Sequence, residues 1–330
     1  MRFKLAMVLA LLAALVALPA AACAQERYTV EGKFERTLRV TGDVDLNVTT
    51  GSGSIDTRVG DAGTVRVSAI IRARSDSRRS ESETEALVRR IEANPPIEQT
   101  GNVIRIGRLE DEEARRNISI SYTLVVPQTT KLYASTGSGS QTIEGLRGVV
   151  EARTGSGGIT ATNLGGSLRA ETGSGSIAMS TVYGAVHART GSGTIRGTGL
   201  SASVIASTGS GGIEVEQTGA GDVELRTGSG GIRVRGVKGA LNASTGSGSI
   251  NVDGTPTGSW RVSTSSGSIT VRLPADAAFD LTAHTSSGSI TTSHPVTVMG
   301  TLGRRDMRGK VRGGGVLVDL STSSGSIRIE

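Results

Sequence analysis

The stretch TGSGSI at residues 245–250 decides the fold, because the chain repeats it with small changes along most of its length. A phosphate-binding glycine loop is needed once or twice in a protein, whereas eleven copies specify a structural unit. From Thr136 to Thr208 the copies follow one another every 18 residues, and the later steps are 19, 18, 19, 21 and 37 residues. A fixed period of this length predicts a solenoid, in which each repeat is one coil stacked on the last.

The residues on both sides of the phrase alternate between apolar and polar. Leu168 and Ala170 share one face before the turn, and Ile213 and Val215 share one face after it. This period of two predicts strands with one buried face. Because aromatic residues are only 2% of the chain, the core must consist of aliphatic side chains. We therefore predict an all-β fold, a parallel β-solenoid (β-helix) of about 18-residue coils, and the crossover rule favours a right-handed coil.

The second glycine of the phrase is the same in every copy, whereas the first is serine in the last three. We expect each second glycine to have a positive φ or to lie too close to the neighbouring coil for a Cβ. These structural turn glycines are Gly53, Gly139, Gly157, Gly175, Gly193, Gly211, Gly230, Gly248, Gly267, Gly288 and Gly325. In one copy Gln141 replaces the isoleucine that follows the turn, which predicts a distorted coil there.

Charged residues one period apart test the solenoid independently. Outward residues at this separation become lateral neighbours about 4.8 Å apart. The sign of the charge alternates along three such columns: Arg153–Glu171–Arg189, Arg196–Glu214–Arg233 and Glu216–Arg235–Asp253–Arg272. Stacking in register favours this alternation. Each exposed pair contributes only about 0–1 kcal/mol, so the columns set the register rather than the stability.

The N-terminus has the pattern of a signal peptide over residues 1–22, with Arg2 and Lys4 before an apolar run and a small-residue cleavage region. The single cysteine, Cys23, lies at its end and excludes an intramolecular disulfide. Cleavage before Cys23 would make this residue a lipidation site, and cleavage after Ala24 would not. Both alternatives predict an exported protein of the periplasm or outer envelope. Contact with the membrane is expected only in the first alternative, through the lipid anchor on Cys23.

Two regions follow the signal segment. Residues 25–130 predict an irregular β region continuous with the solenoid and one helix near 81–93, where Ser82 and Glu85 fit a capping box. Residues 131–330 contain the solenoid repeats and a basic loop at 302–315. This loop either covers the end of the coils or binds anions. Its candidate anion-binding residues are Arg304, Arg305, Arg308, Lys310 and Arg312.

The segments YTLVVP (122–127) and LYASTGSGS (132–140) and the repeated TGSG phrase resemble a bacterial putative-adhesin family of unknown function. The terminal segments FDLTAHTSSGSI (279–290) and GGGVLVDLSTSSGSIRIE (313–330) add to this resemblance, which covers most of the chain after the signal segment. It implies a β-solenoid on exported or envelope proteins and brings no established catalytic residues. The family often carries Asp after the turn glycine, where this sequence has Ser, Gly or Thr, which argues against calcium binding.

Recognisable catalytic patterns are absent from the sequence. The glycine phrases do not continue to Gly-Lys-Ser/Thr before a helix, so they are not nucleotide loops. The spacing of His187, His284 and His294 fits no metal motif, and the outward parity of the first two predicts solvated side chains. We expect no catalytic residues, cofactor or metal, and no binding to nucleic acid.

The sequence therefore predicts a non-enzymatic, exported structural or adhesive module at the bacterial cell envelope. Its expected partners are cell-surface glycan, anionic lipid headgroups or envelope proteins. The alternative is a polysaccharide-active enzyme, a lyase or hydrolase, on a β-helix scaffold. That enzyme would need a cleft of carboxylates and basic residues on one face.

Overall fold

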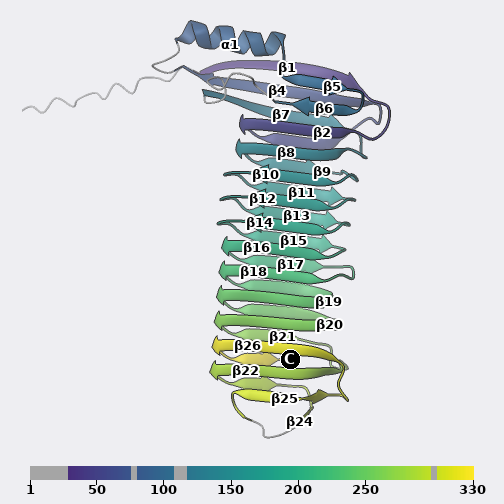
Figure 1. The fold of residues 1–330 in the computed structure, drawn as a ribbon, viewed down its shortest axis with the longest axis vertical. Helices are drawn as coiled ribbons and strands as arrows, with labels where there is room; N and C mark the ends of the chain where they lie inside the picture. Colours follow the sequence, from purple (N-terminus) through teal and green to yellow (C-terminus); the bar gives the residue numbers. More distant parts are fainter. Residues whose placement is uncertain (1–28, 76–79, 108–116, 299–302) are drawn as a thin grey trace, which may run out of the picture.

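The computed structural model describes residues 29–75, 80–107, 117–298 and 303–330. The expected signal segment, Cys23 and the first residue of the expected basic loop lie outside these ranges. The described residues form an all-β rod in which 27 strands belong to one sheet and a single helix lies at one end (Figure 1). Within these ranges, no helix is long and apolar enough to cross a membrane.

Each regular coil contributes two strands, and the strands of successive coils pair in parallel and in register. The first strands of the coils are β2 (Asp45–Ser52), β8 (Lys131–Ser138), β10 (Val150–Thr154), β12 (Leu168–Thr172), β14 (Val186–Thr190), β16 (Val204–Ser210) and β18 (Val223–Ser229). The second strands are β3 (Ile55–Val59), β9 (Gln141–Glu144), β11 (Ile159–Leu164), β13 (Ile177–Val182), β15 (Ile195–Leu200) and β17 (Ile213–Gln217). The parallel β-solenoid is thus confirmed, and the hand of the coil stays a prediction.

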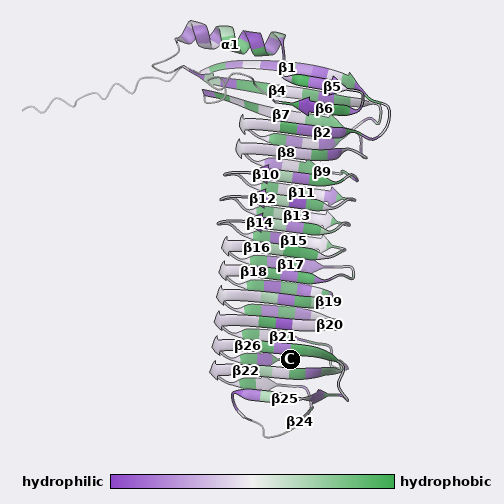
Figure 2. Cartoon of the chain, viewed as in Figure 1, coloured by the Kyte–Doolittle hydropathy of each residue, from purple (hydrophilic) through white to green (hydrophobic). Residues whose placement is uncertain are grey.

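Further along the rod, a second strand runs on into the first strand of the next coil. This continuation forms β19 (Ile232–Ser247) and β20 (Ile250–Ser266), and β21 (Ile269–Arg272) is the second strand that follows. Hydrophobic and hydrophilic residues alternate along the strands (Figure 2). The inward residues, such as Val150, Ala152 and Ile159, are fully buried and form one continuous core along the rod.

The second glycine of each turn is required by the spacing between coils. At all eleven of these glycines, a Cβ would come closer than 3.0 Å to a neighbouring backbone, which belongs to β7 for Gly53 and to the adjacent coil for the other ten. For Gly211, the backbone in the way is the carbonyl of Gly193, and φ is also positive at 152°. Both expected reasons, a positive φ and a close approach to neighbouring backbone, therefore apply to Gly211. The close approach applies in every copy.

The threonine that opens each phrase is buried, and in every copy from Thr136 onward it donates its hydroxyl to a backbone carbonyl of the adjacent coil. Thr172 donates to the carbonyl of Gly157 and Thr190 to that of Gly175, each at 2.8 Å. The same bond recurs from Thr136, Thr154, Thr208, Thr227, Thr245, Thr264, Thr285 and Thr322. In each of these bonds the acceptor is the carbonyl of the second glycine of the adjacent coil. The threonine and the glycine therefore join neighbouring coils together at the turn.

We expect Thr190→Val to lower the free energy of unfolding by about 1–3 kcal/mol, because the substitution keeps the shape but leaves the Gly175 carbonyl without this donor. The shift of the urea midpoint measures the loss. Thr198→Val is the control, since Thr198 is exposed and should change stability by no more than about 0.5 kcal/mol. Equal effects of the two substitutions would contradict a structural role for the threonine bond.

The N-terminal end of the rod is closed by antiparallel strands and the helix. Strand β1 (Thr29–Arg39) pairs with β4 (Thr64–Arg74), which pairs with β7 (Ile118–Val126), and β7 is parallel to β3. A hairpin of β5 (Ile97–Thr100) and β6 (Val103–Ile106) adds to β2. Helix α1 (Glu81–Ala93) lies over β1 (Figure 1). The antiparallel layer and the helix therefore cover the first coil.

Helix α1 lies where the sequence predicts it, near residues 81–93, but its N-cap is two residues earlier than expected. Its N-cap is Ser80, whose side chain forms a capping box with Glu83, so the capping box predicted at Ser82 and Glu85 is wrong. Glu85 instead pairs with Arg89 at 3.3 Å. The buried face of the helix is made by Thr84, Leu87, Val88 and Ile91. The apolar stripe correctly predicted the position of the helix. The capping residue was not predictable in the same way, because several neighbouring Ser and Glu residues could form a capping box.

The C-terminal end differs from simple stacking in chain order. Strands β26 (Val316–Ser324) and β27 (Ile327–Ile329) lie between β20–β21 on one side and β22 (Phe279–Ser287) with β23 (Ile290–Thr292) on the other. Strand β25 (Asp306–Val311) then pairs antiparallel with β22 and with β24 (Val296–Val298). The middle of the expected basic loop is therefore a strand, because residues 306–311 pair with β22 and β24 at the end of the stack.

The coil containing Gln141 keeps its register, so the predicted distortion is wrong. Gln141 pairs with Ile55 on one side and Ile159 on the other, as an isoleucine would. Its buried side chain donates to the carbonyls of Ala134 and Arg153 at 3.3 and 2.5 Å. These bonds satisfy its amide nitrogen inside the core, which allows a polar residue in the isoleucine column.

Candidate functional site

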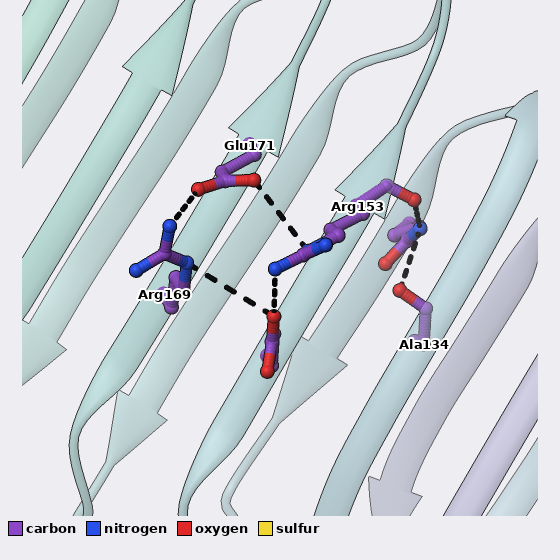
Figure 3. Close-up of polar contacts among 6 residues, drawn as sticks. Ala134, Arg153, Arg169 and Glu171 are labelled. Carbon is purple, nitrogen blue, oxygen red and sulfur yellow. Dashed lines mark hydrogen bonds and ion pairs between the residues drawn. The ribbon is translucent and has the colours of Figure 1, made fainter.

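The outward faces of the coils carry the charged residues, and on the early coils these form a closed network. Glu151, Arg153, Arg169 and Glu171 form four ion pairs, two of them at 2.5 Å and the others at 3.5 and 4.0 Å (Figure 3). All four side chains are partly exposed. Two arginines balance two glutamates, so this part of the rod presents no net charge to a partner.

The predicted charge columns agree with the strand register, and one step of the third column lies at a bulge. The pairing of β-strands places Arg153, Glu171 and Arg189 side by side, and likewise Arg196, Glu214 and Arg233. Glu214 lies within 3.8 Å of both Arg196 and Arg233. These two columns are confirmed.

In the third column, Glu216 pairs in register with Arg235, and Asp253 with Arg272. The expected step from Arg235 to Asp253 falls at a bulge, because the register shifts between Val234 and Val237 in β19 and leaves Arg235 and Gly236 together opposite Asp253. Arg235 comes within 4.0 Å of Glu214. The shift occurs where β19 continues into the next coil without a return turn.

The five cationic candidates surround β25 at the C-terminal end of the rod. Arg308 and Lys310 project from the exposed face of β25, and their Cα partners on β22 are Thr282 and Asp280. Arg312 donates to the carbonyl of Ala275 at 2.9 Å. The backbone carbonyls of Arg304 and Arg305 accept hydrogen bonds from Ile290 and Thr285. Backbone bonds thus hold the segment on the end of the stack, while all five side chains remain exposed: Arg304, Arg305, Arg308, Lys310 and Arg312.

One anionic group lies among these cations. Asp306 is paired with His284, Nδ1 to Oδ1, at 2.6 Å, and both side chains are exposed. This contact links β25 to β22, its antiparallel neighbour. Five exposed cations and one carboxylate lie within residues 304–312, so this end of the rod carries a local excess of positive charge.

An apolar groove on the outer face of the rod was missed by the sequence analysis. Its lining includes Val204, Ile205, Val223, Leu241, Trp260 and Leu317. Ile205 is 44% exposed and Leu317 41% exposed. The alternation of inward and outward positions could have revealed it in the sequence. Ile205 occupies an outward position that carries Arg169 and His187 in the two preceding coils.

Among the described residues, no group of three or more His, Cys, Asp or Glu residues could hold a metal ion. Burial raises the pKa of the Tyr122 phenol, which lies in the core beside the Phe34 ring, far from the groove and the basic segment. His187 and His284 face outward as predicted, whereas His294 is buried against Phe279.

These features define the molecule as an all-β solenoid rod with a neutral outer face and one basic end. Residues 166–330 match the family described as Toastrack DUF4097, and the chain therefore belongs to this family, whose function is unknown. The resemblance to a putative-adhesin family of unknown function, expected from the motifs, is confirmed. A search of the curated proteins finds none that matches the sequence.

Two solved structures are similar to the chain. One is a putative cell adhesion protein from Clostridium sporogenes, 11% identical, with a TM-score of 0.28, covering 91% of this chain and 99% of the other. The second is a putative adhesin from Bacteroides fragilis, 12% identical, with a TM-score of 0.26, covering 91% of this chain and 97% of the other.

Proposed function

We propose that the protein is a non-enzymatic, exported adhesive module at the bacterial cell envelope, whose rod presents a rigid surface to proteins or glycans. The observation that supports this proposal most is the stack of coils held by parallel pairing, buried threonine bonds and close glycine contacts. Such a stack separates two ends by a fixed distance without a flexible joint. Family membership supports the same conclusion.

The alternative, a polysaccharide-active enzyme, finds less support in the outward residues. A lyase or hydrolase would need free carboxylates near basic groups in a cleft. Glu151, Glu171 and Glu214 are all paired with arginines on the open face. Incubation with acidic polysaccharides separates the two functions: retention of intact polymer supports the adhesive module, and a falling chain length of the polymer would establish the enzyme.

We further propose that the basic end contacts anionic groups, namely cell-surface glycan or lipid headgroups. The triple variant Arg304→Ser/Arg305→Ser/Arg308→Ser is expected to elute from heparin at a clearly lower salt concentration than the parent, because three exposed cations are lost from one end. The elution salt on a heparin column measures this effect.

The matched control for this experiment removes the same charge from the side of the rod. Arg169→Ser/Arg196→Ser/Arg233→Ser takes away three arginines that are ion-paired with glutamates. We expect this control to weaken retention much less than the variant of the basic end. Unchanged retention of the Arg304, Arg305 and Arg308 variant would discard the basic end as a contact site.

The export proposal depends on the N-terminal segment. We propose that the protein reaches the periplasm or outer envelope and that Cys23 is its only possible lipid anchor. Mass spectrometry of the mature protein distinguishes the two cleavage alternatives. An acylated N-terminal Cys23 supports the anchor, and an unmodified N-terminus after Ala24 would show a protein released from the membrane.

A further inference from the structure

The last coil of the chain is not the last coil of the stack. The coil of β26 and β27, residues 316–329, is inserted between the coil of β20–β21 and the coil of β22–β23. It pairs in parallel on both sides, so that Val318 is the Cα partner of Trp260 on one side and of Leu281 on the other. The last coil in chain order therefore occupies an interior position of the stack.

The connections on both sides of this coil are adapted to the insertion. Between β21 and β22 the chain uses residues 273–278, six residues, whereas three residues, 165–167, join β11 to β12. The longer connection spans two coil spacings of about 4.8 Å instead of one. Before β26 lie three consecutive glycines, of which Gly313 and Gly314 both have a φ of 88°. The inserted coil is thus attached through a glycine hinge.

The contacts that hold the inserted coil are the same contacts that join coils elsewhere. Thr322 donates to the carbonyl of Gly267 at 2.9 Å, and Thr285 donates to that of Gly325 at 2.8 Å. The amide of Leu273 donates to the carbonyl of Glu330 at 2.8 Å. The neighbouring coils therefore recognise the repeat phrase and its alternating pattern, which any copy of residues 316–329 would supply.

Charge pairs add to this recognition. Arg261 of β20 lies 3.5 Å from Asp319, and Arg272 of β21 lies 3.2 Å from Glu330. Both acidic residues belong to the C-terminal segment, and both arginines belong to the coil that receives it. These pairs are partly exposed and contribute to register more than to stability.

We propose that the position between β20–β21 and β22–β23 is a strand-acceptor site and that it also accepts the C-terminal coil of a second copy of this chain. Two chains would then exchange residues 316–329 reciprocally, and every contact made within one chain would be made between two. Only the hinge at 313–315 has to change conformation. The inference concerns assembly of the rod and does not depend on the proposed adhesive function.

Disulfide trapping in the full chain tests the exchange. Ser263 of β20 and Ser321 of β26 are Cα partners on the outer face, and the spacing of parallel strands, about 4.8 Å, allows a disulfide between them. Ser263→Cys and Ser321→Cys are placed in separate Cys23→Ser chains that carry different tags and are expressed together. We expect a covalent dimer that contains both tags and disappears on reduction.

Two controls make this result decisive. The pair Ser244→Cys and Ser263→Cys reports on neighbouring coils that follow one another in the chain, and its mixed dimer should be several-fold weaker because no terminal segment can exchange there. The single-chain variant Ser263→Cys/Ser321→Cys should form an internal disulfide. Mixed dimer no stronger than the control pair would overturn the exchange, and failure of the internal disulfide would overturn the inserted coil itself.

A hinge variant provides a second measurement. Gly313 has a positive φ but open space around it, so Gly313→Val strains the folded-back hinge without creating a clash. An exchanged hinge is free to leave this conformation, so the mixed dimer should increase relative to the parent hinge. A folded Gly313→Val protein with no increase in mixed dimer would count against the glycine hinge as the exchanging element.

Discussion

Gly211→Ala is expected to lower the free energy of unfolding by about 3 kcal/mol or more, one of the two largest effects in the molecule. The new Cβ would meet the carbonyl of Gly193 in the adjacent coil, and the positive φ of Gly211 is also strained for alanine. Overpacking and backbone strain each cost about 1–3 kcal/mol. The shift in the urea midpoint, followed by circular dichroism, measures the loss.

The control for this prediction is the first glycine of the same turn. Gly209→Ser should cost less, because φ is not positive at Gly209, its Cβ would lie 2.6 Å from the Gly191 carbonyl oxygen against 2.2 Å for Gly211 and Gly193, and three coils already carry serine at this position. A Gly211→Ala protein as stable as Gly209→Ser would show that the coils can move apart at the turn. The role assigned to the repeated second glycine would then be wrong.

Trp260→Ala is the second substitution with a large expected effect, a loss of about 3–5 kcal/mol in the free energy of unfolding. Trp260 is fully buried, and its indole nitrogen donates to the carbonyl of Gly239 at 3.0 Å. Truncation to alanine would leave a cavity where the acceptor site for the inserted coil begins. Circular dichroism during urea unfolding gives the measurement, since the variant has no tryptophan fluorescence.

Trp260→Leu separates the cavity from the hydrogen bond. Leu241 and Val318 occupy the same inward column in the two neighbouring strands, so leucine fits the pattern of the core. We expect a clearly smaller loss than for alanine, since most of the apolar volume remains. If leucine and alanine destabilise the rod equally, the lost indole bond, rather than the cavity, accounts for the cost.

Sequence reasoning predicted the regular part of the rod because one period controls many contacts at once. Arg153, Glu171 and Arg189 could be placed side by side from an 18-residue spacing alone, and β-strand pairing confirms it. Gln141 was misjudged, because its hydrogen bonds to Ala134 and Arg153 exist only once the coil is closed. The bulge that places Arg235 and Gly236 together opposite Asp253 was not predicted, because it leaves the spacing of the phrase almost unchanged.

The candidate contact surfaces were only partly predictable. The cations of the basic segment were visible as a cluster in the chain, but their presentation on strand β25 depends on pairing with β22 and β24. The apolar groove was missed, because its lining comes from first strands of several coils and from Leu317 of the inserted coil. A surface assembled from distant segments has no local pattern.

The sequence by itself determined the repeating structural unit of this protein, which consists of strands with one apolar face, a turn with an obligatory glycine, and a buried threonine. These features depend on neighbours within one period, so the repeat encodes them in every copy. Only the tertiary structure decided the order of the coils at the C-terminal end, where residues 316–329 lie inside the stack. The reason is that every coil presents nearly the same strand edge, so local chemistry does not distinguish one neighbouring coil from another. The lengths of the connections and the glycine hinge determine which coils lie next to each other.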